Sequence, residues 1–130
     1  MIRNLLLAFT FLSLFFVSCS NGPGTGGQAS ITGKVYAENW NSTCTLISGE
    51  YYAPDEDVYI IYGDDPSYGD RIKTGPDGTF WFRYLRPGKY TIYVYSKDCS
   101  APSGKTTVTA TVEITEKKQA VTLDDIKIKK

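Results

Sequence analysis

The sequence predicts an all-β fold, a single seven-stranded antiparallel β-sandwich over residues 31–130, preceded by an export signal and a flexible tether. Three observations lead to this fold. Short runs of large apolar residues alternate with polar ones at period 2, Gly- and Pro-containing turn signals separate the runs, and no run beyond the N-terminal signal has helical period. Short strands with turns between them are typical of a sandwich.

Residues 1–18 have the pattern of a bacterial export signal. A positive residue, Arg3, precedes an apolar run, Leu5–Val17, and Cys19 follows the small Ser18. The run is too short for a membrane span, which needs about 20 apolar residues. A Cys after a small residue resembles the lipobox of bacterial lipoproteins. That resemblance implies acylation of Cys19, with palmitate among the acyl chains, and anchoring in the cell envelope, at the outer membrane. An ordinary secretory signal is the alternative.

Residues 19–30 are expected to form a flexible tether. The stretch SNGPGTGGQAS carries no charge and almost no apolar surface, so burial cannot offset its ordering entropy. The remaining residues, 31–130, are enough for one domain with one core.

Seven strands are predicted in this domain. The sixth alternates strictly, with Val108, Ala110, Val112 and Ile114 on one face. The seventh changes phase at Asp124–Asp125, which predicts a bulge or a bend there. The predicted strands are Ile31–Tyr36, Val58–Tyr62, Arg71–Thr74, Thr79–Leu85, Tyr90–Ser96, Thr106–Thr115 and Ala120–Lys129.

The most informative stretch is Thr74–Val94, TGPDGTFWFRYLRPGKYTIYV. Two turns, at Gly75–Gly78 and at Pro87–Gly88, flank large residues at period 2, which specifies a β-hairpin. The stretch also resembles the hairpin of carboxypeptidase regulatory-like domains, relatives of transthyretin-like and Cna-B-like sandwiches. This resemblance implies an accessory or interaction module and not an enzyme.

Two cysteines remain after Cys19. If successive strands reverse direction, Cys44 in the first loop and Cys99 after the fifth strand lie at the same end of the sandwich. We therefore expect a Cys44–Cys99 disulfide, as an oxidising compartment allows. Two free thiols are the alternative.

The composition argues against catalysis, and we expect no catalytic residue, no metal site and no cofactor. The chain has no histidine, which removes the usual general base and most transition-metal ligands. Acidic loop residues, at 55–57 and at 64, 65 and 70, lack the spacing of a calcium loop and are expected to be solvated. Lys and Arg total 14, as do Asp and Glu, so no basic surface for nucleic acid is expected.

One feature points to binding. If the large residues of the hairpin and of the second strand face the core, their neighbours face outward. We expect these neighbours to form one outer face and the candidate binding site: Tyr59, Ile61, Trp81, Arg83, Tyr93 and Tyr95. An aromatic outer face usually marks a contact surface. The long loop over residues 37–54 is expected to fold over this face, unless a partner occupies it.

These observations predict a function outside catalysis. We expect a lipid-anchored binding or scaffolding module of the cell envelope, held to the membrane by its N-terminal lipid and contacting a protein partner. The alternative is a carbohydrate-binding lipoprotein that stacks a glycan on the aromatic face. Which face of the membrane carries the domain stays open.

Overall fold

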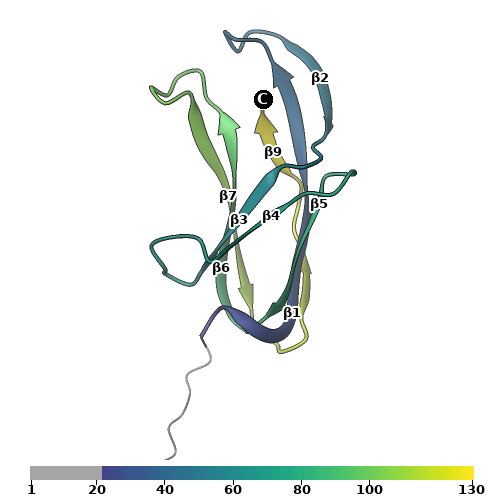
Figure 1. Cartoon of the computed structure of the whole chain (residues 1–130), viewed down its shortest axis with the longest axis vertical. Helices are drawn as coiled ribbons and strands as arrows, with labels where there is room; N and C mark the ends of the chain where they lie inside the picture. Colours follow the sequence, from purple (N-terminus) through teal and green to yellow (C-terminus); the bar gives the residue numbers. More distant parts are fainter. Residues whose placement is uncertain (1–21) are drawn as a thin grey trace, which may run out of the picture.

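The computed structural model describes residues 22–130, which form two β-sheets packed face to face (Figure 1). The all-β sandwich is thereby confirmed, whereas the predicted signal peptide and Cys19 lie outside the described residues. Within residues 22–130 no helix is long and apolar enough to cross a membrane. The strands are β1 (Thr25–Trp40), β2 (Ile47–Tyr52), β3 (Asp57–Tyr62), β4 (Asp70–Lys73), β5 (Thr79–Leu85), β6 (Gly88–Lys97), β7 (Lys105–Ile114), β8 (Ala120–Thr122) and β9 (Ile126–Lys129).

Strand β1 is the centre of the first sheet. Its first half pairs with β5 and β8, and its second half pairs with β2 and β9. The second sheet has the order β4-β3-β6-β7 and is antiparallel throughout. The pairs of β1 with β8 and with β9 are parallel, so the predicted fully antiparallel arrangement is wrong for the C-terminal strands.

The core lies between the sheets and is formed by alternate residues of β1, β3, β5, β6 and β9, together with the end of β7. Every side chain that the alternation assigns to the interior of the hairpin and of β3 is buried, which removes apolar surface from water at about 25 cal/mol per Å². These residues are Val58, Ile60, Phe80, Phe82, Tyr90, Ile92 and Val94.

The structure has nine strands where seven were predicted, because two segments pair differently. The expected loop over residues 37–54 instead continues β1 to Trp40 and returns as β2, so it forms a hairpin. We call residues 37–52 the arm. The predicted break in the last strand is confirmed: β8 and β9 are separate, and Leu123 donates its N–H to the Thr32 carbonyl between them at 2.8 Å.

Strand structure begins earlier than residue 31, where the domain was predicted to start. β1 starts at Thr25, within the segment expected to be a tether, and Ala29 is buried in the core. The start of β1 and the arm lie at opposite ends of the described sandwich, with the C-terminus near the arm (Figure 1). Below, the anchor end is the end at which residue 22 lies.

Candidate functional site

The predicted aromatic face divides between the two sheets. Tyr59, Tyr93 and Tyr95 lie on the outer face of the four-stranded sheet with Ile61, because β3 and β6 are neighbours there. Trp81 and Arg83 are also outward, but β5 belongs to the other sheet. The turn between β5 and β6 crosses from one sheet to the other, so the two strands do not pair and the predicted β-hairpin over Thr74–Val94 is wrong. Residues that point away from the core on β5 and on β6 therefore lie on opposite faces of the sandwich. The prediction of one continuous face is wrong in this respect.

Four tyrosines form a cluster on the four-stranded sheet, and we call it the tyrosine surface: Tyr59, Tyr68, Tyr93 and Tyr95. The rings of Tyr59 and Tyr93 stack with centroids 4.9 Å apart and planes 5° apart. Tyr95 meets both rings edge-on, at 5.5 Å and 5.8 Å. Aromatic pairs in these geometries each contribute about 0.5–1.5 kcal/mol beyond burial. The rings are therefore fixed by one another.

Tyr68 was not among the predicted residues. It lies in the loop between β3 and β4, and its ring meets Tyr59 edge-on at 5.0 Å. The neighbouring Gly69 donates its N–H to the Ile60 carbonyl at 2.8 Å and packs directly on the Tyr62 ring, where a Cβ has no room. This contact turns the loop back over the sheet. A loop residue has no period-2 signal, so the alternation could not identify it.

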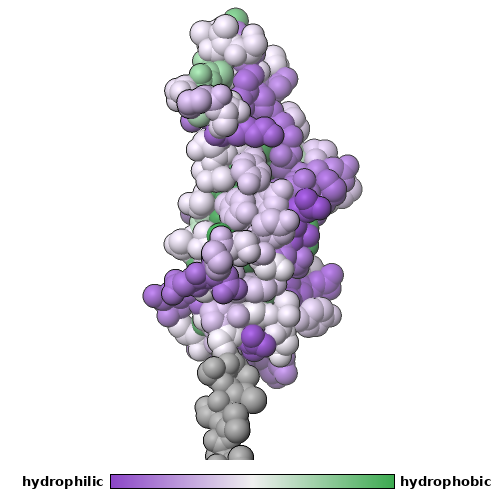
Figure 2. Space-filling view, turned by 60° about the vertical axis from the view of Figure 1, so that its left-hand side comes forward, coloured by the Kyte–Doolittle hydropathy of each residue, from purple (hydrophilic) through white to green (hydrophobic). Residues whose placement is uncertain are grey.

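Polar groups surround the tyrosine surface. Arg71 is the β4 partner of Tyr59, and the Tyr59 hydroxyl, followed by Asp57, raises the pKa of the Arg71 guanidinium. On the other side, Thr109 and Thr107 of β7 pair with Tyr93 and Tyr95. Figure 2 brings this side of the molecule forward and shows pale, weakly polar residues along the middle with strongly hydrophilic ones toward the sides.

Tyr93 is half-buried within the tyrosine surface, whereas Tyr95 and Tyr68 are exposed. Burial, followed by the nearby Tyr95, raises the pKa of Tyr93. Tyr95 and Tyr68 retain 46% and 47% of their surface in contact with solvent. The tyrosine surface therefore presents exposed rings and hydroxyl groups, with the Arg71 guanidinium at its edge.

The opposite face has a separate aromatic group. The Arg83 guanidinium lies over the Trp81 ring, 4.1 Å from its centroid, and Trp81 is 52% exposed. The arm does not cover this ring, because β2 pairs edge-to-edge with β1 and is itself exposed along its length. The expectation that residues 37–54 bury an outer face is therefore wrong.

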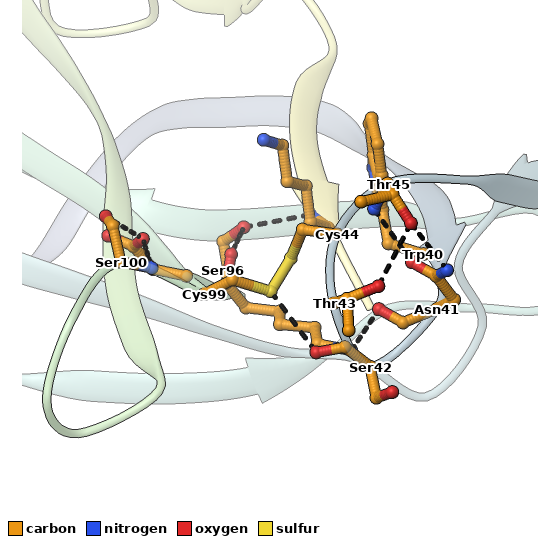
Figure 3. The surroundings of a disulfide bond; sticks show 12 residues. Trp40, Asn41, Ser42, Thr43, Cys44, Thr45, Ser96, Cys99 and Ser100 are labelled. Carbon is orange, nitrogen blue, oxygen red and sulfur yellow. Dashed lines mark hydrogen bonds between the residues drawn. A yellow bond between two sulfur atoms is a disulfide. The ribbon is translucent and has the colours of Figure 1, made fainter.

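The arm is tied down by the Cys44–Cys99 disulfide, with Cα atoms 6.2 Å apart (Figure 3). This confirms the predicted pairing. Around it, the Asn41 carboxamide oxygen accepts the Thr45 backbone N–H at 2.8 Å, which shapes the turn at the tip of the arm. Lys97 reaches across and donates to the Asn41 carbonyl at 2.9 Å.

Residues 22–130 hold no group of three or more His, Cys, Asp or Glu side chains that could ligate a metal ion. The acidic loop residues considered for calcium accordingly do not converge within this range.

Comparisons with known proteins do not assign this chain to a family. No family model matches it, and no curated protein matches it. Among solved structures, it is similar to PA1324 from Pseudomonas aeruginosa, for which carbohydrate binding has been suggested. The identity is 16%, the TM-score is 0.48, and the match covers 78% of this chain and 90% of that one.

Proposed function

We propose that this protein is a non-catalytic binding module, acting outside the cytoplasm, that holds carbohydrate on the tyrosine surface. The observation that carries the proposal is the mutual packing of the four tyrosine rings on one rigid sheet. A surface whose rings are already fixed loses little side-chain entropy on binding. The disulfide supports a location in an oxidising compartment.

The chemistry of the surface suits a polyhydroxylated ligand. Exposed rings offer flat apolar faces for sugar C–H groups, and phenol hydroxyls both donate and accept hydrogen bonds. Arg71 and the threonines of β7 extend the polar rim. Protein interfaces usually have a more apolar core, and Ile61 is the one aliphatic residue among the outward positions of β3. These features favour carbohydrate over the protein partner that the sequence predicted.

We further propose that the module is lipid-anchored in the cell envelope through Cys19, at the outer membrane, and that it is related to carboxypeptidase regulatory-like domains. Growth with labelled palmitate should label the protein. The Cys19→Ala variant should carry no label. An unlabelled wild-type protein that leaves the membrane fraction freely contradicts the anchor, and it leaves the carbohydrate proposal standing.

A glycan array followed by titration of the best ligand tests the binding proposal. Tyr95→Ala removes one exposed ring of the tyrosine surface and should weaken binding about 2- to 10-fold, the range for one aromatic contact. Trp81→Ala is the matched control, because that ring is exposed to a similar degree on the opposite sheet. It should leave the affinity unchanged.

The outcomes separate the alternatives. Binding that is lost in Trp81→Ala and kept in Tyr95→Ala places the ligand on the other sheet and contradicts the proposed site. An array without any ligand, together with an envelope protein captured by the wild type and not by Tyr95→Ala, replaces carbohydrate with a protein partner.

A further inference from the structure

The N-terminal segment is fastened to the anchor end of the sandwich by two side chains. The buried Tyr90 hydroxyl accepts the Gly24 N–H at 2.9 Å and lies 3.2 Å from the Gly24 carbonyl. Arg86 donates from Nε to the Gly22 carbonyl at 2.7 Å and from its backbone N–H to Gly24 at 2.8 Å. Residues 22 and 24, which were expected to belong to the flexible tether, are thus bound to the sandwich.

This fastening sets how far the domain can lie from a lipid on Cys19. Gly22 is three residues beyond Cys19 in the chain, and an extended chain spans at most about 3.6 Å per residue, or about 11 Å in all. With Cys19 acylated, as proposed above, the anchor end stays close to the lipid headgroups. The inference that follows rests on that part of the proposed function for its geometry.

A cationic depression of about 320 Å³ lies at the anchor end. Its lining comprises Gly26, Gly27, Gln28, Arg86, Pro87 and Lys117, with two basic and no acidic side chains. The backbone of residues 26–28 bulges out of the sheet, because Thr25 and Ala29 both pair with Leu85 and the residues between them have no partner on β5. A bulged backbone of this kind can turn its N–H groups toward a bound anion.

Arg86 is placed to use its free donors there. Nε is bound to Gly22, and the two terminal amino groups make no hydrogen bond with any residue of the described range. The guanidinium lies along the glycine backbone: a Cβ at Gly24 would come within 2.9 Å of Nη2, and one at Gly26 within 3.5 Å of Nη1. Glycine at position 24 accommodates this close approach, whereas the distance at Gly26 is that of an ordinary contact.

An exposed tyrosine precedes Arg86 in the chain. Tyr84 is 68% exposed and adopts a φ of 59°, a left-handed conformation that is strained for a tyrosine. It is two residues from Arg86, at the end of β5. Tyrosine rings are enriched at the headgroup level of membranes, because one end is apolar and the other polar.

We propose that the anchor end is a lipid-headgroup site, in which Arg86 and Lys117 bind the phosphate of an anionic phospholipid while Tyr84 lies at the interface. The charge of the depression is complementary to phosphate, and each basic residue near an anionic surface contributes about 1 kcal/mol. Binding there orients the long axis of the sandwich away from the membrane and presents the sheets sideways.

Lysine footprinting on the anchored full chain tests this site. The protein, whose intact mass establishes acylation, is reconstituted in vesicles of phosphatidylcholine alone or with added phosphatidylglycerol. Acetylation of Lys117 is compared with that of Lys105, another exposed lysine, which begins β7. Anionic lipid should protect Lys117 about five-fold relative to Lys105, which is the factor for about 1 kcal/mol. Salt near 1 M should remove the protection, since it reduces the screening length to about 3 Å.

Three results bear on the proposal in distinct ways. Equal acetylation of the two lysines in every vesicle overturns it. Protection by inorganic phosphate alone, in detergent without phospholipid, overturns the lipid source and leaves a site for free phosphate. A protein without acyl mass contradicts the anchor; the same footprint, taken with the soluble protein and the same vesicles, then still shows whether anionic lipid protects Lys117.

Discussion

Replacing Tyr90 by Phe isolates the fastening of the N-terminal segment, because it removes one oxygen atom from the core. The hydroxyl contacts the Arg86 carbonyl at 2.5 Å, the Gly24 carbonyl at 3.2 Å and the Gly24 N–H at 2.9 Å. The Gly24 carbonyl keeps the Arg86 backbone N–H as a donor in the variant. The Gly24 N–H loses its side-chain partner while it remains buried.

The expected cost follows from that donor. A buried hydrogen-bonding group that loses its partner destabilises a protein by about 1–3 kcal/mol. We therefore expect the free energy of unfolding of Tyr90→Phe to fall by about 2 kcal/mol. For a domain near 100 residues this lowers Tm by about 8–16 °C. The Gly24 amide should also exchange its hydrogen faster than amides in the centre of β1.

Urea and thermal unfolding of the full chain measure this loss, and Tyr62→Phe is the matched control. The Tyr62 ring packs edge-on against Tyr90 at 6.0 Å, and its hydroxyl makes no hydrogen bond within residues 22–130. That variant should change stability by less than about 0.5 kcal/mol. Equal losses in the two variants, or a loss below 0.5 kcal/mol in Tyr90→Phe, would refute the reasoning.

Three further predictions concern other parts of the molecule. Reduction of the Cys44–Cys99 bond, which joins residues 55 apart, should cost up to about 4 kcal/mol, measured by calorimetry; two thiols that alkylate in the native protein would contradict the bond. Tyr84→Gly should raise the free energy of unfolding by up to about 1 kcal/mol, because the exposed ring contributes little to stability and the left-handed backbone conformation of Tyr84 is strained. Urea unfolding measures this change, and a lower stability of the variant would show instead that the ring packs against the domain. Burial raises the pKa of Tyr93 and Tyr90 in the folded protein, so the unfolded state releases these protons first and the free energy of unfolding should fall as pH rises above about 10. Thermal melts and phenolate absorbance measure this, and a stability that does not change with pH in that range would contradict the shifts.

Alternation predicted the core of this protein because one face of each sheet is buried. A shift of one residue would expose Phe80, Phe82 and Ile92 together, so period 2 alone fixes which side chains point inward. The same pattern also located the phase change near Asp124. The prediction that Cys44 and Cys99 form a disulfide is confirmed. It required only the end of the sandwich at which each strand begins or ends, and not the sheet to which the strand belongs.

Alternation could not predict which sheet each strand joins. Trp81 and Tyr93 both point away from the core, and the sandwich places them on opposite faces because β5 pairs with β1 while β6 pairs with β3. Pairing depends on contacts between segments far apart in the chain. Tyr68 reaches the tyrosine surface through a loop whose path is set by Gly69 and Tyr62, which no periodic pattern records.

The length of β1 has a mechanical consequence. This strand runs over 16 residues, about 50 Å, and each other strand of its sheet is hydrogen-bonded to it. Tension between the N-terminus and the C-terminal end acts along β1 and β9, which are parallel and leave the molecule at opposite ends. Their hydrogen bonds are then loaded in shear and must break together, whereas strands pulled apart from one end break them in turn. A domain held at its N-terminus and pulled at the far end would resist that force through the strand that holds the sheet together.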